Sequence, residues 1–308
     1  MASTGRRGRA YGCRCAIARA ALALGIATAM TSAMLQTPAV ADDRQAPAHA
    51  SPWNPEQASR VRVVAGGVNR AGAAPTVYAG LEIELDEGWK TYWRNPGSSG
   101  VPPRIDFDGS DNLASAELLF PAPLRFKDRD GDIIGYKRSV VFPVALTPKD
   151  PSKPILLKVS AEFGICREVC VPVQPVLSLL VPPDAATSAP GERLAEAVAR
   201  VPATDAAGPG APRLQRIAAT LSGDKPRVLI DAVFPGEAES GDIFLEAPDG
   251  IWIPLPQPAG QAESGARRFV VDLTDGADLA DLKGRAIRMT LVGSAGQLET
   301  TFDLVEAR

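Results

Sequence analysis

The stretch Thr76-Val-Tyr-Ala-Gly-Leu-Glu-Ile-Glu-Leu85 alternates apolar and other residues along its length. Val77, Ala79, Leu81, Ile83 and Leu85 share one face, whereas Glu82 and Glu84 lie on the other. Side chains of a β-strand point alternately to its two faces, so this pattern predicts a strand with one buried face. Further short strands, separated by Gly, Pro and Asp, are predicted at 60–64, 90–94, 114–120, 139–146, 155–162 and 173–181. This series, without long helical periods, predicts an antiparallel β-sandwich.

The C-terminal third repeats the same kind of pattern. Short strands are predicted at 214–221, 227–234, 242–247, 251–253, 267–273, 287–292 and 298–305. The intervening segment, 184–212, predicts a linker with one short helix, since residues 192–201 have apolar residues at helical spacing. The predicted fold is therefore all-β, with two antiparallel β-sandwich domains at 59–183 and 213–308. The second domain contains no Cys or His, and we interpret it as a scaffold or a partner-binding module.

The N-terminal segment, residues 1–41, has the order of an export signal. Five arginines and no acidic residue come first, an apolar run extends from Ala16 to about Met30, and Ala39-Val40-Ala41 offers a cleavage site. We expect a signal peptide cleaved after Ala41, an exported mature chain without a membrane span, and a disordered linker at 42–58.

Charge and histidine content exclude several classes of function. Loss of the five signal-peptide arginines would take the formal net charge from −3 to about −8, and no basic patch for nucleic acid remains. His49, the only histidine of the chain, lies in the segment 42–58 that we expect to be disordered. Ser-His-Asp and Cys-His catalysis and metal sites with two histidines are therefore excluded. We predict no cofactor and no metal site.

A pair of cysteines is the main chemical feature of the mature chain. Of the four cysteines, Cys13 and Cys15 fall in the predicted signal, which leaves Cys166 and Cys170. The strands predicted on either side would place this pair at the end of a hairpin. A disulfide closing so small a ring adds only about 2 kcal/mol of stability. A structural disulfide, thiol–disulfide exchange and Cu(I) binding by two thiolates are all compatible with the spacing.

Three aromatic residues fall in the predicted strand around 90–94. Strand alternation places Trp89 and Trp93 on one face and Tyr92 on the other, together with Lys90 and Arg94. Core packing is the expected role of these rings, and a platform for stacking a ligand is the alternative.

Four sequence segments together resemble a known family. They are Gly88–Gly97, Gly100–Pro103, Gly135–Lys137 with Phe142–Val144, and Gly164–Pro172. In content and order they are similar to the N-terminal periplasmic domain of the DsbD/ScsB thiol:disulfide interchange proteins, over about Thr76–Val181. The three-residue gap between the cysteines is closer to the ScsB-like branch than to DsbD.

The resemblance implies a fold, a site and a location. The family domain is an immunoglobulin-like sandwich whose two cysteines carry electrons from a membrane partner to periplasmic acceptors. Cys166 and Cys170 match those cysteines, and the loop from Phe126 to Gly135 occupies the position of the loop that caps them. Phe126 and Tyr136 are the candidate shielding residues. We therefore expect a periplasmic protein.

The expected function is thiol–disulfide exchange between a membrane reductant and periplasmic partners. The eight-helix membrane part and the thioredoxin-like part of DsbD are not found in this sequence, so a separate electron donor is expected. Whether the chain acts as a disulfide reductase, and its oligomeric state, are left open. The alternatives are a binding or assembly module with a structural disulfide and a Cu(I)-binding copper-tolerance factor.

Overall fold

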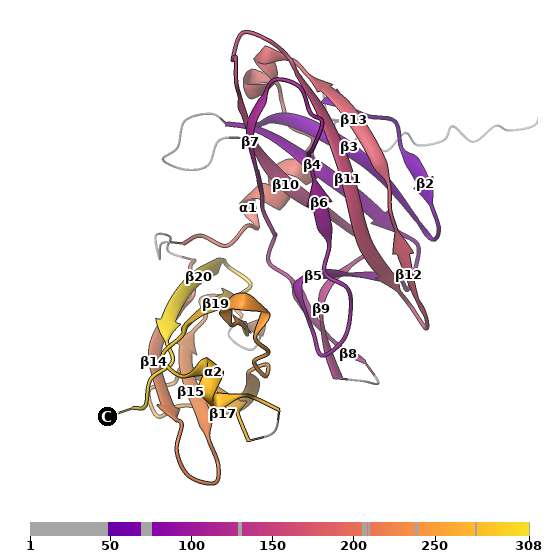
Figure 1. Cartoon of the computed structure of the whole chain (residues 1–308). Helices are drawn as coiled ribbons and strands as arrows, with labels where there is room; N and C mark the ends of the chain where they lie inside the picture. Colours follow the sequence, from indigo (N-terminus) through magenta and orange to yellow (C-terminus); the bar gives the residue numbers. More distant parts are fainter. Residues whose placement is uncertain are drawn as a thin grey trace, which may run out of the picture. The chain divides into compact units, whose positions relative to one another are not determined.

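The computed structural model describes residues 49–68, 76–128, 131–204, 208, 210–237, 240–274 and 276–307 (Figure 1). The predicted signal peptide lies outside these residues. The described residues all fall in one compact unit. As predicted, the fold is all-β with antiparallel sheets, arranged as an immunoglobulin-like sandwich (residues 49–181) and a C-terminal β-unit (residues 213–303).

The first sheet of the sandwich has six strands, in the order β1-β3-β4-β10-β7, with β2 also paired to β3. These strands are β1 (His49–Ala50), β2 (Asn54–Glu56), β3 (Ser59–Val68), β4 (Thr76–Leu85), β7 (Leu113–Leu118) and β10 (Ser139–Pro148). As predicted, Ala79, Leu81 and Ile83 of β4 are buried in the core between the sheets, but the opposite face is buried too, because Tyr78 packs beneath helix α1 (Glu192–Ala199) and Glu82 is 1% exposed.

The second sheet has seven strands, in the order β12-β11-β5-β9-β8, with β13 and β6 also paired to β11. These strands are β5 (Lys90–Gly97), β6 (Arg104–Asp106), β8 (Leu124–Asp128), β9 (Gly131–Lys137), β11 (Ile155–Cys166), β12 (Cys170–Val173) and β13 (Val176–Val181). Its inner face contributes Trp93, Leu157 and Ile165 to the core, all fully buried. Core packing is thus confirmed for Trp93.

Helix α1 (Glu192–Ala199) covers the outer face of the first sheet. Its buried residues Leu194, Ala197 and Val198 pack against Val64 and Tyr78. The approach is close, because a Cβ on Gly80 of β4 would lie 3.0 Å from Leu194 Cδ1. A 3₁₀ turn, η1 (Pro183–Thr187), precedes α1. The short helix was predicted, but this part of the expected linker is packed onto the sandwich, because α1 has a strongly apolar face to bury.

The C-terminal β-unit consists of two smaller antiparallel sheets (Figure 1). One has the order β14-β15-β18-β17 and the other β16-β19-β20. Two short helices, η3 and α2, connect strands. The bounds are β14 (Arg213–Thr220), β15 (Arg227–Val233), β16 (Asp242–Glu246), η3 (Pro248–Gly250), β17 (Gln257–Gln261), β18 (Arg267–Asp272), α2 (Leu279–Leu282), β19 (Ala286–Val292) and β20 (Gln297–Asp303).

Two local predictions were wrong. Residues 49–58, expected to be part of a disordered linker, contain β1 and β2, both paired with β3. The reason is that these short strands attach through backbone hydrogen bonds and need no apolar alternation. Residues 251–253 form no strand and follow η3 as irregular chain. Within the described residues, no helix has the length and apolar character that crossing a membrane requires.

Candidate functional site

Cys166 and Cys170 form a disulfide at the end of the β11–β12 hairpin. They are paired residues in the strand register, with an S–S distance of 2.05 Å and a Cα–Cα distance of 4.2 Å. The three residues between them make the turn, in which Arg167 N donates to Val169 O at 3.2 Å. The predicted position of the pair at a hairpin end is confirmed.

The two cysteines differ in exposure. Cys166 is 3% exposed, whereas Cys170 lies on the surface. Cys166 belongs to a small apolar cluster with Tyr92, Phe126 and Ile133, separate from the main core. A reagent from solution therefore has readier access to Cys170 than to Cys166.

The hydroxyl of Tyr92 contacts the sulfur atoms of both cysteines. Its hydroxyl donates to Cys166 Sγ at 2.7 Å and lies 3.4 Å from Cys170 Sγ. The ring is brought there by the pairing of β5 with the end of β11, where Thr91 is opposite Ile165 and donates to Gly164 O at 2.8 Å. Tyr92 was not among the predicted site residues, although strand alternation places it on the face opposite Trp93.

Two glycines make room for the Tyr92 ring. A Cβ on Gly100, whose φ is +130°, would lie 2.3 Å from Tyr92 Cε1, which is too close for any other residue. A Cβ on Gly164 would lie 3.3 Å from Tyr92 Cε2. These glycines belong to the segments 100–103 and 164–172 that carried the family resemblance, which gives the two motifs a steric explanation.

Strands β8 and β9, here called the cap hairpin, bring Phe126 to the disulfide. Phe126 and Ile133 are opposite each other in the register and are both in the cluster with Cys166. Phe126 is 9% exposed, and Lys137 Nζ lies 4.1 Å from the centre of its ring. The structure thus brings Phe126 and Cys166 together.

Tyr136, the other candidate shielding residue, lies elsewhere. It belongs to the main core, where its ring packs edge-on against Phe142 and its hydroxyl donates to Pro121 O at 2.7 Å. Burial raises the pKa of Tyr136 well above 10.0. Its hydroxyl therefore remains a neutral donor at physiological pH, and its contacts are those of a core residue.

The turn between the cysteines carries a positive charge, a negative charge and an exposed apolar residue, Val169. Arg167 and Glu168 are exposed, and the Arg167 guanidinium lies 5.7 Å from the centre of the Trp89 ring. No group of three or more His, Cys, Asp or Glu side chains suited to a metal ion occurs among the described residues. The chemistry that these residues offer is that of the disulfide and the tyrosine hydroxyl.

Comparison with known proteins finds similar sequences and structures for the part of the chain that holds the cysteines. The family model "Thiol:disulfide interchange protein DsbD, N-terminal" matches residues 55–182. No curated protein sequence matches the chain. Among 53 matching solved chains is the N-terminal periplasmic domain of ScsB from Proteus mirabilis, with 21% identity and a TM-score of 0.61.

That structure covers 84% of this chain, and 99% of its own length is matched. A coverage of 84% necessarily extends beyond residue 182, so the likeness in fold includes part of the C-terminal β-unit. The family match itself contains β3 to β13 and both cysteines. Over residues 55–182, the chain is similar to the N-terminal domain of the DsbD/ScsB thiol:disulfide interchange proteins.

Proposed function

We propose that the protein is a periplasmic thiol–disulfide exchange protein that passes electrons from a membrane-bound dithiol to periplasmic partners through Cys166 and Cys170. The observation that carries this proposal is the asymmetry of the disulfide. One sulfur lies under an aromatic cap and accepts a hydrogen bond from Tyr92, and the other belongs to an exposed residue. Exchange needs one sulfur open to attack and a leaving sulfur that is stabilised as a thiolate.

Reduction of the pair begins with attack on Cys170 Sγ by a thiolate of the donor dithiol. A new S–S bond forms between the donor and Cys170, while the Cys166–Cys170 bond breaks. Cys166 leaves as a thiolate, accepts the hydrogen bond from Tyr92 Oη and then takes up a proton. The second thiolate of the donor attacks its own sulfur in the mixed disulfide. The donor leaves as a disulfide and Cys170 is released, so that two electrons have moved to the pair.

Delivery of the electrons runs through the same atoms in reverse order. The Cys170 thiolate attacks a disulfide of the partner and forms a mixed disulfide. Cys166 then attacks Cys170 Sγ, which restores the Cys166–Cys170 bond and releases the partner as a dithiol. In this scheme Cys170 meets the partners and Cys166 resolves the intermediates, as their difference in exposure favours.

The location and the domain boundaries are part of the proposal. Residues 1–41 have the composition of an export signal, and the solved relative is a periplasmic domain. We propose that the mature chain works in the periplasm. We also propose that residues 59–183 form the redox domain and residues 213–308 a second β-sandwich domain.

Trapping of mixed disulfides in cells tests the exchange and assigns the roles of the two cysteines. Cys166→Ala removes the resolving sulfur, so the intermediate at Cys170 loses its fast intramolecular exit. We expect this variant to accumulate reducible adducts with exported or membrane proteins on non-reducing gels. Cys170→Ala keeps only the buried sulfur and should form few or none.

The double variant, Cys166→Ala with Cys170→Ala, provides the background. Adducts formed by Cys170→Ala instead of Cys166→Ala would reverse the roles of the two sulfurs. If neither single variant forms adducts above the double variant, the disulfide is structural and the protein is a binding or assembly module.

A further inference from the structure

The cap hairpin has two differently occupied faces. Phe126 and Ile133 face the cluster that contains Cys166. Strand alternation turns the neighbouring residues Arg125, Lys127 and Asp132 to the opposite face. That face meets the C-terminal β-unit, and the contacts on it come from a part of the chain more than a hundred residues away.

Arg125 joins the cap hairpin to the C-terminal β-unit. Its Nε and Nη2 donate to the two carboxylate oxygens of Asp242 at 2.8 and 2.7 Å, and Nη2 also donates to Ile243 O at 3.2 Å. Its Nη1 donates to Asp132 Oδ2, on the other strand of the hairpin, at 2.9 Å. Arg125, on β8, therefore connects the other strand of the cap hairpin, β9, to the first residues of β16.

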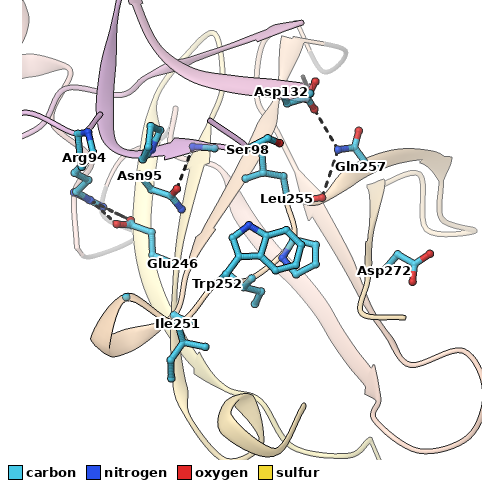
Figure 2. A pocket seen from close by; sticks show the side chains of 18 of the residues that line it. Arg94, Asn95, Ser98, Asp132, Glu246, Ile251, Trp252, Leu255, Gln257 and Asp272 are labelled. Carbon is cyan, nitrogen blue, oxygen red and sulfur yellow. Dashed lines mark hydrogen bonds and ion pairs between the residues drawn. The ribbon is translucent and has the colours of Figure 1, made fainter. Parts of the chain in front are cut away.

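Gln257 makes a second link from the C-terminal β-unit. Its side-chain amide donates to Asp132 Oδ2 at 3.2 Å, as Figure 2 shows. Burial alone would raise the pKa of Asp132, but the hydrogen bonds from Arg125 and Gln257 and the charge of Arg125 lower it below its ordinary value. Burial likewise would lower the pKa of Arg125, and Asp242 and Asp132 more than offset this effect. Both groups are thus charged at neutral pH, and the links are charge-assisted.

A cavity lies on the same side of the hairpin as these links. It has a volume of about 880 Å³ and is lined by Lys127, Gly131 and Asp132 of the cap hairpin and by Trp252 and Leu255 of the C-terminal β-unit. Figure 2 shows the Trp252 ring within this cavity, and the residue is 52% exposed. The hairpin therefore has space on the face that points away from the cysteines, and charged hydrogen bonds hold it next to that space.

We infer that the C-terminal β-unit is the element that sets how often the cap opens over Cys166, with Arg125, Asp242 and Gln257 as positioning residues. The inference rests on the proposed exchange function, because it assigns a role to the cap in that reaction. The links fix one face of the hairpin, and the opposite face keeps Phe126 against the sulfur. Loss of a link frees the hairpin to move into the cavity, which uncovers Cys166 Sγ and lets thiols attack this sulfur in addition to Cys170 Sγ.

The test compares thiol exchange in Asp242→Asn with exchange in the wild type, with purified full-length protein and dithiothreitol as the reductant. We expect the rate of reduction to rise by up to about tenfold, the factor for losing one charge-assisted hydrogen bond from the closed state, because attack at Cys166 Sγ adds to attack at Cys170 Sγ. Reoxidation by oxidised dithiothreitol should accelerate equally, because an open cap admits both reagents. The equilibrium between the pair and dithiothreitol should stay within about twofold of the wild type.

Asp231→Asn is the matched control. Asp231 accepts two hydrogen bonds from Arg268, at 2.7 and 2.8 Å, but this pair joins β15 to β18 inside the C-terminal β-unit and does not touch the cap. The rates of thiol exchange of Asp231→Asn with dithiothreitol should equal those of the wild type. Gln257→Ala serves as a second cap variant if Asp242→Asn does not fold, and it should accelerate exchange by a smaller factor.

Hydrogen–deuterium exchange supplies a readout that does not depend on the disulfide. Amides of 124–128 and 131–137 should exchange faster in Asp242→Asn, and those of β14 and β15 should not. The inference would be overturned if Asp242→Asn and Gln257→Ala had the same rates of reduction and reoxidation, and the same amide protection, as Asp231→Asn. A failure to trap adducts in cells, combined with faster reduction of Asp242→Asn, would refute the proposed exchange function and leave the control of the cap intact.

Discussion

The hydroxyl of Tyr92 lies within hydrogen-bonding distance of both sulfurs, at 2.7 Å from Cys166 and 3.4 Å from Cys170. The ring is 1% exposed and is held between Gly100 and Gly164, so the hydroxyl has little freedom to turn away. When the disulfide is attacked, negative charge develops on the leaving sulfur. A fixed donor beside a developing charge stabilises the transition state more than the ground state.

Tyr92→Phe removes this donor and keeps the ring. A hydrogen bond to a charged group contributes about 1.5–3 kcal/mol, so reduction by dithiothreitol should slow by about 10- to 100-fold. The folded structure should persist, because the ring still fills its space against Phe126 and Ile133. Stopped-flow measurement of the reduction rate at neutral pH tests this expectation.

Tyr78→Phe is the control for the loss of a buried tyrosine hydroxyl. Tyr78 is 5% exposed and packs beneath α1, away from the cysteine cluster. In Tyr78→Phe, dithiothreitol should reduce the Cys166–Cys170 disulfide at the wild-type rate. An unchanged rate in Tyr92→Phe would show that the hydroxyl does not assist the leaving sulfur, whatever its distance in the disulfide form.

At the scale of the element, the hairpin that carries the cysteines is held by more than its disulfide. Strand β11 pairs with β12 from Phe163 to Cys166, with β13 from Ile155 to Ser160, and with β5 and β6 on its other side. Phe163 and Ile165 on the same strand are fully buried. The strand is therefore fixed in the second sheet by its ladders and its core residues.

We expect Cys166→Ala with Cys170→Ala to lower the free energy of unfolding by about 2 kcal/mol or less, the value for closing so short a ring. Phe163→Ala on the same strand should cost about 3–5 kcal/mol, because it leaves a cavity in the core. Chemical denaturation of both variants makes the comparison. A loss in the cysteine variant as large as that in Phe163→Ala would identify the pair as a structural staple.

The elements predicted from the sequence are those whose pattern comes from burial. Apolar alternation identified β4 and the strands on either side of the cysteines, and helical spacing identified α1. Strands β1 and β2 were missed because their hydrogen bonds to β3 leave no such pattern. Trp53, between them, stacks beneath Arg60 and Arg62, at 4.4 and 4.2 Å from its ring centre. These contacts are tertiary and have no local signal.

The composition of the candidate site was predictable only in part for the same reason. The cysteines were evident because they were the only pair left after the predicted signal, and Phe126 followed from the family resemblance. The contact between Tyr92 and Cys166 depends on the pairing of β5 with β11, which brings together residues 74 positions apart. Arg125 and Asp242 are still farther apart along the chain, and neither belongs to a motif.

At the scale of the whole molecule, the sandwich and the C-terminal β-unit share buried residues. Phe244 of β16 is fully buried and belongs to the core of the sandwich, with its ring centre 5.7 Å from that of Trp93. Next to it, Arg94 donates to both carboxylate oxygens of Glu246 and to Glu299. Burial would lower the pKa of Arg94, but these carboxylates raise it above its ordinary value. Contacts at this boundary should therefore stabilise both β-units.

Phe244→Ala should destabilise both β-units. Phe244 belongs to β16 of the C-terminal β-unit, and its side chain fills part of the core of the sandwich. We expect the free energy of unfolding to fall by about 3–5 kcal/mol and amide exchange to be faster in both β5 and β16.

Phe269→Ala is the matched variant. Phe269 is equally buried but packs against Phe234 inside the C-terminal β-unit, so the accelerated exchange should be confined to β14–β20. Denaturation followed by hydrogen–deuterium exchange separates the two patterns. If Phe244→Ala leaves the exchange of β5 unchanged, the shared core does not couple the units, and the contacts that join them are those of Arg125, Asp242 and Gln257.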